Sequence, residues 1–183
     1  PRDMVPAFLD AVETIGPEMV LMENVPGLAS PRRRPYLKRV LGRLRRLGYQ
    51  PLHRVLLAAD FGVPQLRRRL FIVGQRKGAF RFPTPTHGPT TDTLHVPSGA
   101  ILTAEPIGAP LPCPVRYAKR PDLRKSPYAG LLYNGGGRPI DLTRPSPTVL
   151  AAAGANKTHW IDTHHVAPGY HAHLKAGGAP RSG

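Results

Sequence analysis

The chain has 183 residues, and its 26 Lys and Arg against 11 Asp and Glu give a formal charge of +15 at pH 7. The single cysteine excludes an intrachain disulfide framework, and the lack of a long apolar run excludes a membrane-spanning helix. We therefore expect a cytoplasmic protein of about one domain with a polyanionic partner, for which duplex DNA is the natural candidate, although a basic surface that serves only solubility is an open alternative.

Two helices and a strand are predicted in the first fifty residues. Apolar side chains recur at helical spacing over residues 1–15, and Gly16-Pro17 ends that helix. Residues 19–22 form an apolar run of strand length that is too continuous for a strand with one exposed face. Glu23, Asn24 and Val25 end this strand before a Pro-Gly turn, and helical spacing returns over residues 31–48.

The segment 31–48 is basic, and it has two interpretations. It is either a helix that contacts the DNA backbone or an ordinary covering helix with a solvated basic face, and charge runs more often indicate the second. Arg32, Arg33 and Arg34 precede the helix and lie close in sequence to Glu23. We therefore take these three arginines as the candidates for DNA-backbone contacts.

Two further strands are predicted at residues 52–58 and 69–74. Their connection is too short for a helical crossover, so the two strands should be antiparallel neighbours. From residue 78 to about 141, helical spacing is poor, and the apolar pieces at 100–102 and 130–133 are strand candidates at best. A short strand and turn at 156–162 and a loose polar tail are predicted to follow.

Three short motifs occur in order along the chain. They are Glu23-Asn24-Val25, then Gln65-Leu66-Arg67-Arg68-Arg69 before a strand, then Arg144-Pro145-Ser146-Pro147-Thr148. In this order, with a short first gap and a long second gap, they resemble the DNA cytosine-5 methyltransferases, and the resemblance covers nearly the whole chain. That family's Gly-rich loop for S-adenosylmethionine and its Pro-Cys nucleophile should lie upstream, and its closing Gly-Asn segment downstream. The chain therefore resembles the C-terminal portion of such an enzyme.

The resemblance implies an α/β fold, with the latter strands of a partial Rossmann-like methyltransferase sheet and a small, irregular, mainly β target-recognition region. It places the C-terminal part of the catalytic lobe at residues 1–77, the target-recognition region at 78–143, and a return segment with a loose tail at 144–183. Without the earlier strands of the sheet, the strand at 19–22 would present an unpaired apolar edge. We therefore expect the isolated chain to be poorly stable, to aggregate, or to pair with a second chain that carries the missing N-terminal lobe.

The family's chemistry gives roles to particular side chains. A thiolate adds to C6 of a cytosine flipped out of the duplex, and C5 then attacks the methyl group of S-adenosylmethionine. By resemblance, Glu23 is a buried acid or hydrogen-bond donor at N3, and Arg69 is the cation near O2. The resemblance also assigns catalytic support to Arg67 and substrate binding to Asn24, Val25, Gln65, Arg144 and Thr148.

Two patterns invite other interpretations. Pro112-Cys113 matches the family's nucleophile dipeptide, but it follows Glu23 in the chain, so we expect an unreactive thiol and no nucleophile in this chain. The histidines between His159 and His173 invite a zinc site, but only Asp162 accompanies them at ligand spacing, so we predict no metal.

The resulting hypothesis is a fragment of a DNA cytosine-5 methyltransferase of a restriction–modification system, inactive by itself, which acts on double-stranded DNA with S-adenosylmethionine. Two alternatives remain. A non-catalytic DNA-binding module predicts that Glu23→Gln leaves all measurable function unchanged. An inactive gene remnant predicts no specific DNA site at physiological salt.

Overall fold

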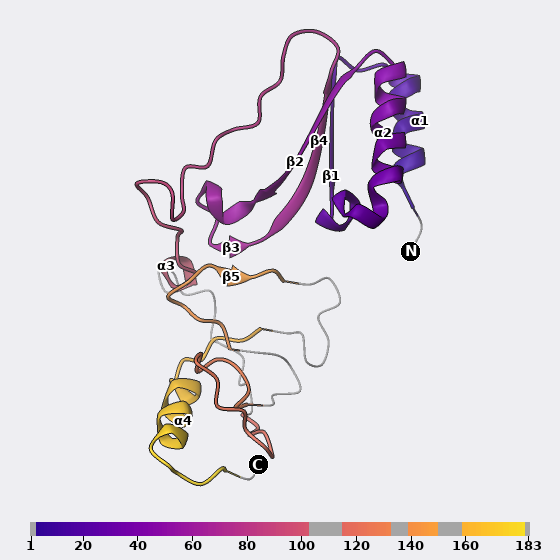
Figure 1. Cartoon of the computed structure of the whole chain (residues 1–183). Coiled ribbons are helices and arrows are strands. Elements are labelled where there is room, and N and C mark those ends of the chain that lie inside the picture. The colour runs from indigo at the N-terminus through magenta and orange to yellow at the C-terminus, as the bar shows by residue number, and fades with distance from the viewer. Residues whose placement is uncertain (1–2, 103–114, 133–138, 150–158, 182–183) are drawn as a thin grey trace. The chain divides into compact units, whose positions relative to one another are not determined.

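The computed structural model describes residues 3–102, 115–132, 139–149 and 159–181 (Figure 1). Its mixture of helices and small sheets confirms the predicted α/β class. The chain forms two compact units, the first of Pro1–Gly62 and Arg67–Leu94 and the second of Val63–Leu66 and His95–Gly183. No helix in the described ranges is long and apolar enough to cross a membrane.

The first unit is built on a three-stranded sheet with the order β1-β4-β2. Its strands are β1 (Met19–Asn24), β2 (Gln50–Leu57) and β4 (Arg68–Gln75), and β4 is antiparallel to both of its neighbours. The predicted antiparallel pairing of the segments 52–58 and 69–74 is therefore confirmed. Because β1 and β2 both run against β4, they are parallel to each other, but β4 separates them.

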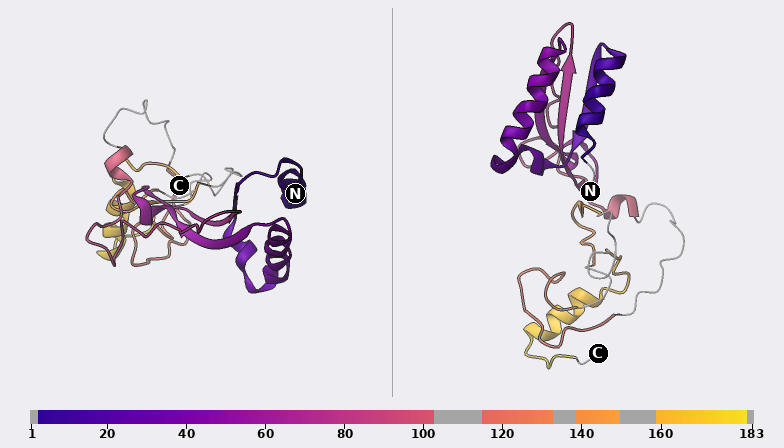
Figure 2. Two further views of the ribbon diagram at one scale, coloured as in Figure 1. Left: turned by 90° about the horizontal axis from the view of Figure 1, so that it is seen from above. Right: turned by 90° about the vertical axis from the view of Figure 1, so that its right-hand side faces the viewer.

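Helices α1 (Val5–Ile15) and α2 (Arg34–Arg46) pack on one face of this sheet (Figures 1 and 2). Gly16 ends α1 in the left-handed conformation, with φ of 61°, as its position in the sequence predicted. The two helices are also joined at the surface, because Arg43 of α2 lies 2.7 Å from Asp10 and 2.6 Å from Glu13 of α1.

The core of the first unit lies between the two helices and the sheet. Its buried apolar residues are Val5, Leu9, Val12, Val20, Met22, Leu28, Leu37, Val40, Leu41, Leu44, Tyr49, Leu70 and Ile72. Helix α2 buries its apolar stripe here, which either interpretation of the basic segment allows. Most of its basic side chains remain exposed on the outside.

The prediction that strand β1 is buried on both faces is wrong. Val20 and Met22 are buried under the helices, whereas Met19 is 46% and Leu21 is 58% exposed. Alternate side chains of a strand point to opposite faces, and within the described residues helices cover only one face of this sheet. An apolar run therefore ends up half-exposed here.

Gly74 of β4 is packed too closely for a side chain. A Cβ atom at this position would lie 2.8 Å from Cγ2 of Val20 and 3.2 Å from Cβ of Tyr49. We expect Gly74→Ala to lower the free energy of unfolding by about 1–3 kcal/mol, because strand or side chains must shift to make room. Urea denaturation followed by circular dichroism measures this change.

Gly42 in the middle of α2 is the matched control for Gly74. A Cβ atom there meets only Nη1 of Arg46, at 3.7 Å, and helix interiors favour Ala over Gly. Gly42→Ala should therefore raise the free energy of unfolding by about 0.5–1 kcal/mol. Equal effects of the same sign in the two variants would contradict the packing argument.

In the part of the chain that the structure describes, three short 3-10 helices connect other elements, namely η1 (Pro26–Ala29), η2 (Pro31–Arg33) and η3 (Ala58–Phe61). The first two carry the chain from the end of β1 to the start of α2. The second unit contains β3 (Gln65–Leu66) and β5 (Ser146–Pro147), which pair in parallel.

The second unit departs from the sequence predictions at two places. Residues 100–102, a strand candidate, belong to the short helix α3 (Gly99–Leu102). The tail, predicted to be loose, contains helix α4 (Val166–Lys175), whose first turn is fixed by the buried carboxylate of Asp162. That carboxylate accepts hydrogen bonds of 2.8 Å from the backbone N–H groups of Val166 and Ala167.

The interval 78–143 is irregular, as predicted, but it is not mainly β in its described residues. Apart from α3, its regular pairing is limited to isolated bridges, such as the one between Tyr117 and Leu132. The end of the strand candidate at 130–133 and the start of the one at 156–162 lie outside the described residues.

Candidate functional site

Glu23 lies at the carboxyl end of β1, beside the start of β4. The strand register pairs Glu23 with Phe71, so Arg69, two residues earlier in β4, lies diagonally opposite on the same face. Nε of Arg69 is 3.0 Å from Oε1 of Glu23, and Nη2 of Arg67 is 4.0 Å from the same oxygen. The structure thus brings together the three residues predicted to be catalytic, and we call them the Glu23 cluster.

The predicted burial of Glu23 is wrong for this structure. The Glu23 side chain is 50% exposed, whereas that of Arg69 is 21% exposed. The reason is the position of Glu23 on the same open face as Met19 and Leu21, which the helices do not cover. The Glu23 carboxylate is therefore held by guanidinium groups rather than by enclosure.

The residues that follow Glu23 shape the end of the strand. Oδ1 of Asn24 accepts a hydrogen bond of 2.8 Å from the backbone N–H of Val25, which stabilises the turn out of β1. The Val25 side chain is 55% exposed. This geometry is compatible with the predicted positions of both residues beside a bound base, and their roles in binding stay predictions.

Gln65, Arg144 and Thr148 belong to the second unit, whereas the Glu23 cluster belongs to the first. The pairing of β3 with β5 places the Gln-Leu segment beside Ser146-Pro147. The Thr148 hydroxyl donates a hydrogen bond of 2.7 Å to the carbonyl of Leu66, which fastens the two motifs together. Motifs far apart in the sequence therefore meet, although two-residue strands carry no periodicity from which this pairing could be predicted.

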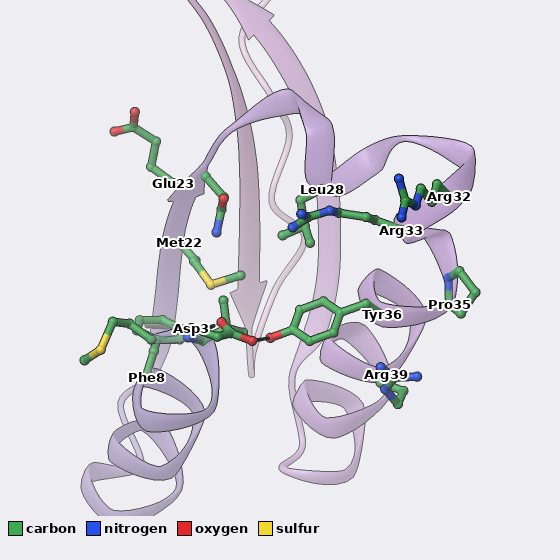
Figure 3. Close-up of a pocket in the computed structure, with 13 residues that line it drawn as sticks. Asp3, Phe8, Met22, Glu23, Leu28, Arg32, Arg33, Pro35, Tyr36 and Arg39 are labelled. Carbon is green, nitrogen blue, oxygen red and sulfur yellow. Dashed lines mark hydrogen bonds between the residues drawn. The ribbon is translucent and has the colours of Figure 1, made fainter. Parts of the chain in front are cut away.

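The three arginines proposed for the DNA backbone do not share one environment. Arg32 and Arg33 are in η2 and line a cavity of about 900 Å³, whose rim includes Glu23 and Asn24. Arg39 of α2 lines the same cavity, but Arg34 does not. We call this cavity the arginine pocket. In Figure 3, the Arg33 side chain extends from η2 toward Leu28, and the Glu23 side chain points away from the arginines.

A hydrogen bond between Asp3 and Tyr36 crosses the arginine pocket (Figure 3). The Tyr36 hydroxyl donates to Oδ2 of Asp3 at 2.5 Å. This bond lowers the pKa of Asp3, and burial together with the same bond raises the pKa of Tyr36. Sequence reasoning missed both residues and Arg39, although Tyr36 and Arg39 are three positions apart on α2 and so share a face.

The histidines near the C-terminus have partners within the protein. Nε2 of His171 donates to the carbonyl of Arg124 at 2.7 Å, and Nε2 of His173 lies 3.0 Å from the carbonyl of Ala179. Asp162, the nearby carboxylate, holds the start of α4. In the described residues, no three His, Cys, Asp or Glu side chains are grouped so that they could hold a metal ion. Cys113 lies outside the described residues.

The chain is similar to DNA methyltransferases along much of its first half. Residues 1–100 match the family model for C-5 cytosine-specific DNA methylases. The chain is 47% identical over 81 residues to Type II methyltransferase M.SacI of Streptomyces achromogenes, a match that covers 44% of this chain and 21% of that protein. It is 39% identical over 106 residues to Type II methyltransferase M.AquIA of a Picosynechococcus species, which covers 52% of this chain and 43% of that protein.

A third relative extends the match further along the chain. Type II methyltransferase M.AplI of Arthrospira platensis is 34% identical over 114 residues, which covers 59% of this chain and 31% of that protein. The chain therefore spans between about a fifth and about two fifths of the length of these curated relatives.

Proposed function

We propose that this chain, which belongs to the C-5 cytosine-specific DNA methylases because more than half of it matches the family model, supplies a base pocket and target recognition. The reaction that they serve is the transfer of a methyl group to C5 of a cytosine flipped out of duplex DNA. The observation that carries this proposal is the contact of 3.0 Å between Glu23 and Arg69. It joins an acid and a cation at the edge of a sheet, where a base can approach.

The two side chains suit two neighbouring atoms of cytosine. Addition of a nucleophile to C6 places negative charge on N3 and O2 of the ring. In the proposed complex, the Glu23 carboxyl donates a hydrogen bond or a proton to N3, while the Arg69 guanidinium donates to O2. Arg67, 4.0 Å from the Glu23 carboxylate, keeps that group oriented when binding of the base draws Arg69 away from Glu23, before the chemical step. The negative charges that develop on N3 and O2 are then stabilised by groups that are in place before the reaction.

The open position of Glu23 has a consequence for this pocket. With half of its surface exposed, the Glu23 carboxyl competes with water for the base. A bound cytosine, or the remaining part of the enzyme, must cover the face of β1 that carries Glu23 to make the site dry. We therefore propose that a second polypeptide or segment, which carries the N-terminal lobe, completes the pocket.

S-adenosylmethionine, the methyl donor of this family, does not fit the residues beside Glu23. The donor carries a sulfonium, an ammonium and a carboxylate group, so its net charge is positive, and the cavity next to Glu23 is lined by Arg32, Arg33 and Arg39. The arginine side chains of this cavity repel a ligand with a net positive charge. We therefore assign none of residues 1–183 to the donor, and propose that other residues build its site.

The proposal predicts that residues 1–183 alone transfer no methyl group to DNA. Their single cysteine, Cys113, follows Glu23, and the proposed reaction needs a thiolate from outside this chain. Adding the polypeptide encoded directly upstream in the same reading frame should produce transfer. The measurement is incorporation of tritium from methyl-labelled S-adenosylmethionine into unmethylated duplex DNA.

The outcomes of this experiment separate the possible explanations. Transfer by residues 1–183 alone that is abolished by Cys113→Ser would show that Cys113 is the nucleophile, against our proposal. The proposed function itself would be contradicted by a mixture that still transfers no methyl group, if residues 1–183 and the upstream polypeptide are both folded and the upstream polypeptide contains a Pro-Cys segment.

A further inference from the structure

The arginine pocket carries a concentration of positive charge that the Glu23 cluster does not use. Arg32, Arg33 and Arg39 are all exposed and line one cavity of about 900 Å³. Within the described residues, no carboxylate lies within the 4.0 Å ion-pair distance of any of these three guanidinium groups. The pocket is therefore electrostatically prepared for an anion that the described protein does not provide.

Two carboxylates border the pocket, and each already has a hydrogen-bond or ion-pair partner other than the three arginines. Asp3 accepts hydrogen bonds from the Tyr36 hydroxyl at 2.5 Å and from the backbone N–H of Val5 at 3.1 Å. Glu23 is paired with Arg69 and points away from the arginines (Figure 3). The Asp3 carboxylate keeps its negative charge beside the arginines, whereas Glu23 is directed to Arg69. One carboxylate therefore faces three guanidinium groups, and the pocket keeps a net positive charge.

The construction of the pocket favours a phosphodiester over a simple ion. Phe8 is partly exposed and supplies apolar surface on which the carbons of a deoxyribose can pack, while the buried Met22 and Leu28 form the apolar floor beneath it. The Arg39 guanidinium lies 5.4 Å from the centroid of the Tyr36 ring, which fixes a side chain that would otherwise be free. Guanidinium groups bind phosphate oxygens through paired hydrogen bonds.

The position of the pocket connects it with the base site. Glu23 and Asn24 are part of its rim, so the same strand end borders both the pocket and the proposed position of the flipped cytosine. A flipped nucleotide remains linked to a phosphate on each side. We propose that the arginine pocket binds a phosphodiester group of DNA next to the target cytosine, an inference that rests on the proposed function.

A matched pair of variants tests this inference. The pocket variant combines Arg32→Gln, Arg33→Gln and Arg39→Gln. The control combines Lys38→Gln, Arg45→Gln and Arg46→Gln, which remove the same charge from exposed positions on α2 outside the pocket. Because all six side chains are exposed, both variants should keep the wild-type melting curve by circular dichroism, and Arg39→Gln alone serves if the triple pocket variant does not.

The readout is the salt dependence of binding to a 24-base-pair duplex, measured by fluorescence anisotropy. Each neutralised phosphate adds about 0.9 to the slope of log affinity against log salt concentration. We expect the pocket variant to lower this slope by about 1 to 2, at least twice the change in the control. Equal changes in the two variants would overturn the inference.

Two further arms separate the sources of the anion and the two proposals. In the first, inorganic phosphate is titrated while the Nε–H NMR signals of the pocket arginines are followed. If these signals saturate at millimolar phosphate, and the salt slope of duplex binding is unchanged in the pocket variant, the DNA assignment is overturned. Glu23→Gln should leave the duplex slope unchanged, because it removes no phosphate contact. The slope result therefore stands even if the methyl-transfer proposal fails.

Discussion

Glu23→Gln is expected to lower the rate of methyl transfer by about 10²- to 10⁴-fold, which is the usual loss when a positioned acid is removed. Gln keeps the size of the side chain and can still donate a hydrogen bond to N3, but it has no proton to transfer. It also loses the charge-assisted contact of 3.0 Å with Arg69. The measurement is the initial rate of tritium transfer by the complete reading frame that contains residues 1–183.

Glu18→Gln is the matched control for this variant. Glu18 is exposed, precedes β1 in the same segment, and has no contact with the Glu23 cluster, so the rate should stay within about twofold of wild type. Duplex binding should be similar in both variants. A loss of less than fivefold in Glu23→Gln would mean that proton transfer from Glu23 is not needed. No transfer by the wild type or by either variant, with duplex binding intact, would favour the DNA-binding module.

Leu44→Ala is expected to lower the free energy of unfolding by about 2–5 kcal/mol, the range found for large-to-small changes in closely packed cores. Leu44 of α2 is 1% exposed and lies in the core between the helices and the sheet. Removing its side chain leaves a cavity that rigid neighbours fill only in part. Urea denaturation of the wild type and the variant, followed by circular dichroism, measures the difference.

Leu94→Ala is the control for core packing. Leu94 is 77% exposed, so its truncation should change the free energy of unfolding by less than about 0.5 kcal/mol. The comparison also concerns the site, because Met22, the residue before Glu23, packs in the same core as Leu44. Similar effects of the two substitutions would mean that the helices do not form the core that the structure describes.

The elements of the first unit were predictable because each has either a regular spacing of apolar residues or a residue that ends the element. Helix α2 has apolar side chains at helical spacing, and Gly16 ends α1 with a left-handed residue. The exposure of β1 was not predictable, since an apolar run does not reveal how many layers will cover it. Its half-exposed face follows from the helices packing on one side only, a tertiary property.

Helix α4 escaped prediction for a local reason. Its sequence contains Pro168 and Gly169, which normally argue against a helix, and both lie in its first turn or directly after it. The helix starts there because the carboxylate of Asp162 holds the N–H groups of Val166 and Ala167. The cap lies four positions before the helix rather than directly at its start, and this is a local arrangement that helical spacing does not signal.

The candidate site was predictable as far as its motifs reach. Glu23, Arg67 and Arg69 were identified by their resemblance to a family pattern, and the strand register explains why they meet. The arginine pocket was only half visible in the sequence. Arg39 belongs to it through the packing of α2 against the start of α1, where Tyr36 binds Asp3, and no sequence motif spans that contact.

The place of β4 in the sheet determines when this unit can form during synthesis. Strand β4 comes last in the sequence of the three strands but lies in the middle of the sheet. Within this sheet, neither β1 nor β2 has a hydrogen-bonding partner until β4 is available, because both strands pair only with β4. Helices α1 and α2 therefore leave the ribosome well before the sheet that they cover, and the Glu23 cluster assembles in the same step as the fold.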